Sequence, residues 1–149
     1  MSTEKITSYS IELEDFKVDV KLKLAALWTS FMFLYIYVDY FHLYMPGTLK
    51  DMISGKVFTF EINQLFLSIA LISVSIPAFM IFLSIALPAK MNRWTNIFLA
   101  TIYIPYTLFN LVGEAWVHMI YAAAVEVVLL LLIIRFAWKW PNRKSHIKP

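Results

Sequence analysis

Four stretches of the chain are apolar over the length that a membrane span needs. A bilayer core about 30 Å thick takes about 20 residues of helix at about 1.5 Å each. The stretches cover residues 24–44, 65–87, 94–112 and 115–138, and the third is the most polar of them. We therefore predict an all-α fold, a polytopic transmembrane four-helix bundle.

The rest of the chain is short, and residues 1–149 are predicted to form a single membrane domain with an N-terminal segment, 1–23, and a tail, 139–149. Alternating residues before the first span fit either an extended segment or one lying on the headgroups. Asp19 is the expected N-cap of the first helix. The loop from Thr48 to Asn63 predicts a short helix or a strand-like cap. The first apolar run is too long for a signal peptide, so we expect none.

Composition supports the membrane class. The chain is 60% hydrophobic and 15% charged, whereas soluble domains carry about 45–50% apolar and about 25% charged residues. This apolar content also excludes a disordered chain. The absence of Cys excludes disulfide scaffolds, thiol catalysis, cysteine zinc sites and cysteine-ligated iron–sulfur clusters.

The positions of Lys and Arg predict the orientation. All but two of the 13 lie in the N-terminal segment, in the loop between the second and third spans, or near the C-terminus; the exceptions are Lys50 and Lys56 in the first loop. The positive-inside rule then places both termini in the cytoplasm and the protein in the inner membrane. The lipid bilayer is thus the expected partner. No basic surface stripe of the kind that binds nucleic acid is present, so we expect no nucleic-acid partner.

A few polar side chains lie inside the predicted spans, where charge is costly and usually faces the bundle interior. Asp39 and Glu126 are the two deep carboxylates. Helical spacing groups other polar residues with them, mostly in the outer half. We predict a polar, aromatic-lined ligand pocket there, lined by Tyr35, Asp39, His42, Tyr106, Asn110, His118 and Glu126. The alternative is that these groups only hydrogen-bond one another and fix helix register.

Two pairs in these spans have the spacing of metal ligands or of a proton relay. Asp39 with His42, and Glu114 with His118, each lie on one helix face. Such pairs suit Zn, Mn or Fe when they converge, but the spacing is common by chance, so we predict no metal site and no cofactor. A carboxylate beside a membrane histidine also suits proton transfer.

Backbone and motif signals add little chemistry. Pro77 and Pro105 each remove a hydrogen bond inside a span, and prolines are frequent in ordinary membrane helices. Ala122–Ala124 gives the fourth span a small face for close packing. The sequence contains no catalytic motif of the HExxH, GxSxG, Walker or Rossmann type, so no catalytic residue is predicted and the chain is not expected to be an enzyme.

Several patterns together resemble one family. They are YxYxDxFxLYxPG from Tyr35 to Gly47, IPxxMxxLSxxLP from Ile76 to Pro88, NRWxNI from Asn92 to Ile97, and AxxExxxxLxIxxxAWxW from Ala123 to Trp140. The ensemble resembles a family of small bacterial four-span membrane proteins catalogued as a domain of unknown function. The resemblance implies a bacterial inner-membrane protein with four helices and no assigned activity. The plan is also similar in architecture to DoxX-like membrane proteins.

Three hypotheses of function follow. The leading one is an inner-membrane protein that binds a small molecule or lipid in the outer-half pocket. The second is a proton-coupled small carrier that acts as a homo-oligomer, with Asp39 or Glu126 as the titrating group. The third is an accessory or scaffold subunit in which the polar residues only fix packing.

Overall fold

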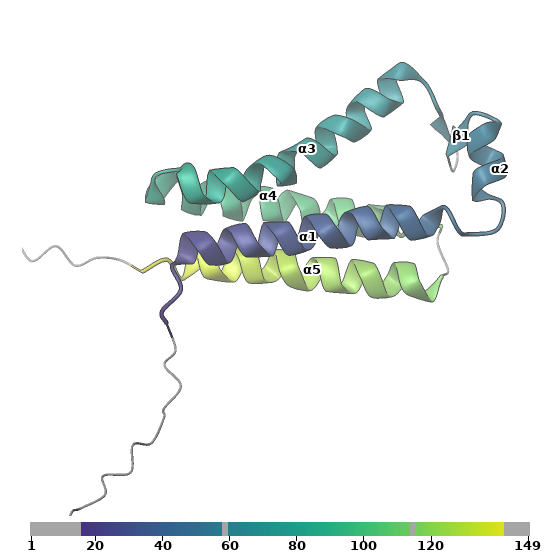
Figure 1. Cartoon of the computed structure of the whole chain (residues 1–149). Coiled ribbons are helices and arrows are strands. Elements are labelled where there is room, and N and C mark those ends of the chain that lie inside the picture. The colour runs from purple at the N-terminus through teal and green to yellow at the C-terminus, as the bar shows by residue number, and fades with distance from the viewer. Residues whose placement is uncertain (1–15, 58–59, 114–115, 142–149) are drawn as a thin grey trace, which may run out of the picture.

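The computed structural model of the chain describes residues 16–57, 60–113 and 116–141. Within these residues the fold consists of four long helices, one short helix and a two-stranded hairpin (Figure 1). The long helices are α1 (Val20–His42), α3 (Gln64–Ala86), α4 (Ala89–Phe109) and α5 (Val117–Trp138). Each lies within a few residues of a predicted span, so the all-helical prediction is confirmed.

The connection between α1 and α3 forms a small cap. It holds α2 (Thr48–Ile53) and the antiparallel strands β1 (Lys56–Val57) and β2 (Phe60–Glu61). For this loop the sequence predicted either a short helix or a strand-like cap, and the structure contains both. We call this end of the bundle the hairpin end, and the end where α1 begins and α5 finishes the termini end (Figure 1).

Side-chain caps fix where the helices begin and end. Asp19 caps α1, as predicted, and its Oδ1 accepts a hydrogen bond of 2.8 Å from the backbone N–H of Lys21. Asn63 caps α3 in the same way at Phe66. The ammonium of Lys21 donates to two carbonyls at the end of α3, those of Ile85 and Leu87. At this C-terminal end of α3, a positive charge satisfies carbonyls that the helix leaves free and interacts favourably with the helix dipole.

The core lies towards the termini end. Helix α1 packs against α3 and α5, and α4 packs against α5 and more lightly against α3. Trp28 and Phe31 of α1 meet Tyr103 of α4 edge to face, with ring centroids 6.0 to 6.2 Å apart. Such aromatic pairs add to the stabilisation from buried area. The fully buried apolar residues include Leu24, Trp28, Phe31, Met80, Ala100, Leu130, Ile133 and Ala137.

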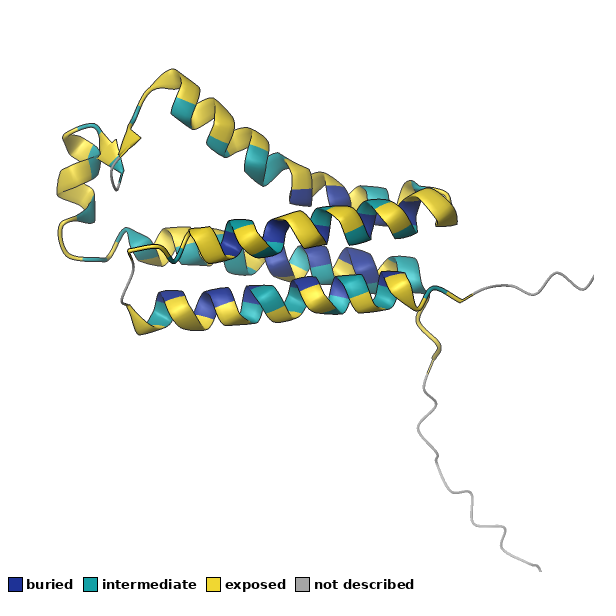
Figure 2. Cartoon of the chain, turned by 180° about the vertical axis from the view of Figure 1, so that it is seen from behind, coloured by how far each residue is buried: buried dark blue, intermediate teal, exposed yellow. Residues whose placement is uncertain are grey.

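Helix α3 has two unlike halves (Figure 2). Its later half buries Met80 and Ser84, whereas no described residue before Pro77 in this helix is buried. Figure 1 shows that earlier part leaning away from the other helices. Pro77 lies where the halves meet, and a proline inside a helix removes one backbone hydrogen bond and permits a bend. Side chains such as Leu67 and Leu71, 55% and 69% exposed, therefore face outward.

Three of the long helices, α1, α3 and α5, are long and apolar enough to cross a membrane. A membrane protein is compatible with this finding, and large exposed side chains such as Phe79, Phe82 and Leu131 suit contact with lipid. Helix α4 is less apolar because its first part carries Lys90, Asn92, Arg93 and Asn96. The prediction of four spans therefore depends on whether α4 also crosses the membrane.

Candidate functional site

Six polar residues at mid-bundle, three of them predicted, form two hydrogen-bonded groups that we together call the polar layer: Tyr35, Ser73, Tyr103 and Tyr106 in one, and Thr107 and Glu126 in the other. The hydroxyls of Tyr35 and Tyr106 lie 3.1 Å apart, and Ser73 Oγ lies 3.2 Å from the Tyr106 hydroxyl. Tyr103 donates to the backbone carbonyl of Ser73. These contacts join α1, α3 and α4 at the depth where α3 begins to diverge.

Glu126 is the most deeply buried carboxylate of the described residues, with 4% of its surface exposed. Its Oε2 accepts a hydrogen bond of 3.1 Å from Thr107 Oγ1 on α4. Tyr35 lies within Coulombic range of Glu126 and of Asp39. A buried carboxylate held by a hydroxyl is a costly group to place between helices, so it either fixes their register or takes part in function.

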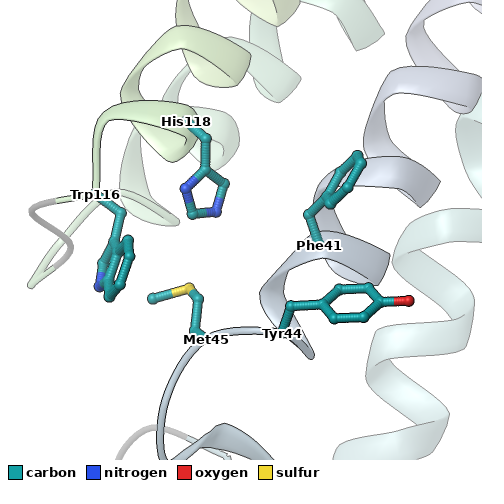
Figure 3. Close-up of a pocket in the computed structure, with 5 residues that line it drawn as sticks. All are labelled: Phe41, Tyr44, Met45, Trp116 and His118. Atoms are coloured by element: carbon teal, nitrogen blue, oxygen red, sulfur yellow. The ribbon is translucent and has the colours of Figure 1, made fainter.

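The hairpin end carries a hollow of about 340 Å³, lined by Phe41, Tyr44, Met45, Trp116 and His118. In Figure 3 the imidazole of His118 lies above Trp116 and Met45, across the hollow from Phe41. The His118 and Trp116 rings lie 5.9 Å apart, nearly edge to face. Nε2 of His118 is shielded from solvent and has no hydrogen-bond partner within the described residues. The hollow is therefore mostly apolar, with the His118 imidazole in its wall.

The structure divides the seven predicted pocket residues between these places. Tyr35, Tyr106 and Glu126 belong to the polar layer, and His118 belongs to the hollow. Asp39 and His42 lie on the last turns of α1, within Coulombic range of each other, but Asp39 is exposed in the structure and is not the deep carboxylate that the sequence predicted. Asn110 is exposed at the end of α4. Glu126 is eight residues from His118, about 12 Å along α5 by helical rise. The predicted pocket therefore extends from the hollow towards the middle of the bundle, and Glu126 lies outside the hollow.

Metal ligands do not converge in the described part of the chain, where no group of three His, Cys, Asp or Glu residues has the geometry to hold an ion. Glu114, half of one predicted pair, lies outside the described residues.

Sequence reasoning missed a second polar group near the termini end, which we call the amide network: Trp28, Ser84, Asn92 and Asn96. All four are completely buried. Trp28 Nε1 donates to Asn96 Oδ1 at 2.7 Å, and Asn96 Nδ2 donates to Asn92 Oδ1 at 2.6 Å. Asn92 donates to the carbonyl of Ser84.

The amide network ties α1 and α3 to the first half of α4. A signal for it was present in the sequence, because two asparagines four residues apart share a helix face. Both belong to the NRWxNI pattern, and Ser84 belongs to the pattern that ends at Pro88.

Comparison with protein families identifies the group to which these features belong. The model of a family described as "Family of unknown function (DUF6326)" matches residues 11–146. The chain belongs to DUF6326. The match includes all four long helices, so the polar layer, the amide network and the hollow all lie within the DUF6326 region. Neither the curated proteins nor the solved structures contain a match.

Proposed function

We propose that this protein binds a small amphipathic molecule from the membrane in the hollow at the hairpin end. The observation that carries the proposal is Nε2 of His118, which is shielded from solvent and has no hydrogen-bond partner in the described part of the chain, at a hollow otherwise lined by Phe41, Tyr44, Met45 and Trp116. Ligand sites combine mostly apolar walls with a few polar groups that orient the ligand. This hollow has that composition.

The lining specifies the chemistry of the ligand. An aromatic or acyl body suits the aromatic and thioether walls, since such side chains supply large apolar contact. An acceptor or anionic group suits His118, because a neutral imidazole donates through a protonated ring nitrogen. The volume of about 340 Å³ is at the lower end of the range of about 300–1,000 Å³ for ligand sites. It favours a small molecule or one acyl chain over a whole lipid.

The proposal includes a four-span topology with both termini in the cytoplasm of a bacterial cell. Helix α4 has 21 residues, about 32 Å at the helical rise. Its low hydropathy is compatible with spanning, because Asn92 and Asn96 are buried against other helices and never meet lipid. Cytoplasmic termini place the hollow at the outer surface. Labelling of a cysteine placed at Lys139 by an impermeant maleimide added outside the cell would overturn this orientation.

A proton-coupled carrier is the second candidate, and one observation favours it. Asp39 and Glu126 lie within Coulombic range of each other, and Tyr35 of the polar layer lies within Coulombic range of both. Carboxylates inside spans are typical of proton pathways. This function needs Glu126 to titrate, whereas binding in the hollow does not.

Photolabelling tests the leading proposal. The purified protein in nanodiscs would be exposed to a medium-chain fatty acid carrying a diazirine, and the labelled peptides mapped by mass spectrometry. We expect label at residues 41–45 and 116–118, displaced by the unlabelled acid. Trp116→Ala should lose most of this label because it removes one wall of the hollow.

Trp94→Ala is the matched control, since Trp94 is a similarly exposed tryptophan at the termini end, and it should label like the wild type. A photoreactive alkylamine of the same length distinguishes the role of His118. His118→Leu should reduce labelling by the acid more than labelling by the amine. Label spread evenly over the lipid-facing side of α3, and unchanged in Trp116→Ala, would contradict binding in the hollow.

A further inference from the structure

A second hollow, of about 370 Å³, lies at the termini end of the bundle. One side is formed by residues 17–20 and Lys23, at the start of α1, and the other by Trp140 and Pro141, just after α5. It lies at the opposite end of the bundle from the hollow lined by His118. Its chemistry is also different, because two of the lining side chains, Lys17 and Lys23, are cationic.

The charges around this second hollow are not equally available. Lys21 is committed elsewhere, since its ammonium donates to the carbonyls of Ile85 and Leu87. Asp19, the acidic residue among the described residues of the lining, accepts the N-cap hydrogen bond from the backbone of Lys21. Its carboxylate thus faces the positive end of the α1 dipole, which offsets part of its charge. The positive charges of Lys17 and Lys23 therefore outweigh the remaining negative charge of Asp19, and the hollow attracts an anion.

One aromatic side chain, Trp140, lines the same hollow, and a second, Phe136, lies beside Lys23. The Lys23 ammonium lies 5.5 Å from the centre of the Phe136 ring, a cation–π distance. Trp140 forms the opposite wall. Tryptophan is enriched at the level of the lipid headgroups, where an apolar ring and a polar edge are both satisfied. The hollow therefore combines two ammonium groups with a surface suited to the upper part of an acyl chain.

We propose that this second hollow binds the phosphate of an anionic membrane lipid, with Lys17 and Lys23 as the phosphate ligands and Trp140 against the glycerol and acyl region. Basic pockets between membrane helices at the headgroup level bind anionic headgroups by this chemistry. The apolar flank favours a lipid over free inorganic phosphate, which gains nothing from Trp140. The site is independent of any ligand at the hairpin end.

Native mass spectrometry tests this site directly. The purified full chain in mild detergent would be titrated with phosphatidylglycerol and, in parallel, with phosphatidylcholine. We expect the wild type to retain phosphatidylglycerol in preference, and Lys17→Gln/Lys23→Gln to weaken its binding by about 25-fold, since each surface lysine contributes roughly a fivefold attraction to anionic lipid. Lys17→Arg/Lys23→Arg keeps both charges and should keep the preference, which separates loss of charge from damage to the fold.

Lys50→Gln/Lys56→Gln is the matched control, because it removes the same charge at the hairpin end. It should bind phosphatidylglycerol as the wild type does. Equal losses in the two Gln variants would overturn the proposal, since general charge would then explain the binding. An unchanged preference in Lys17→Gln/Lys23→Gln would overturn it too. Displacement of the lipid by millimolar inorganic phosphate would identify a free-phosphate site instead and would also reject the lipid.

Discussion

The two halves of the bundle solve the problem of polar groups between helices in different ways. At the termini end, the amide network is completely buried, and its side-chain groups hydrogen-bond across α1, α3 and α4. Towards the hairpin end, hydroxyls and the Glu126 carboxylate form the polar layer, α3 leans away, and an aromatic hollow remains. The first half holds the helices together, and the second leaves room for a ligand.

The comparison teaches where this bundle stores its stability when it lies in a membrane, as proposed above. Apolar burial drives little helix association in lipid, because the lipid tails are as apolar as the side chains. Close packing and hydrogen bonds between helices carry more of the association there. A chain of this length can therefore leave one half of the bundle loosely packed only if close packing and hydrogen bonds hold the helices of the other half together.

The largest expected effect is on the amide network. Asn96→Leu removes both an acceptor for Trp28 and a donor to Asn92, leaving buried polar groups without partners. We expect the free energy of unfolding to fall by about 2–4 kcal/mol, measured by thermal or denaturant unfolding in mild detergent. Asn110→Leu makes the same change at an exposed position and should have little effect. Equal destabilisation by the two variants would remove the distinction between the halves.

A smaller effect is expected in the polar layer. Glu126→Gln keeps the size of the side chain and an oxygen that accepts from Thr107, so the free energy of unfolding should change by less than about 1 kcal/mol. Photolabelling of the hollow should persist. In liposomes loaded with a pH-sensitive dye, this variant also separates the two candidate functions.

Proton uptake by the wild type that Glu126→Gln abolishes would favour the carrier over the binding protein. Glu61→Gln, at an exposed carboxylate on β2, is the matched control. Strong destabilisation by Glu126→Gln, without any change in labelling or flux, would instead assign the polar layer to helix packing.

The sequence predicted the four long helices to within a few residues because the length and hydropathy of a segment indicate a helix without knowledge of the tertiary structure. The N-cap at Asp19 was also predictable, since capping is local. The lean of α3 was not, because its apolar side chains surround the helix and indicate no preferred packing face. Only the bundle shows that Met80 and Ser84 are buried while Leu67 and Leu71 are exposed.

The candidate site was predicted only in part, because helical spacing does not show how the helices and loops pack. Helical spacing grouped Tyr35 with Asp39, which is exposed in the structure, and pointed to Tyr106 and Glu126, of which Glu126 is buried and Tyr106 half-buried. It placed all seven residues in one pocket, although depth along the helices separates His118 from Glu126. Met45 and Trp116 were not predicted as lining residues because they lie in loops, where side-chain positions depend on how the helices pack.

The distance between α1 and α3 at each end tests the contrast between the halves most directly. The chain has no cysteine, so spin labels can be placed as pairs at exposed positions, Leu22→Cys/Ile85→Cys at the termini end and Ile36→Cys/Leu67→Cys towards the hairpin end. Double electron–electron resonance in nanodiscs should give a narrow distance distribution for the first pair and a broad one for the second, because unpacked segments fluctuate more. Equally narrow distributions at both ends would contradict a bundle with one tied and one open half.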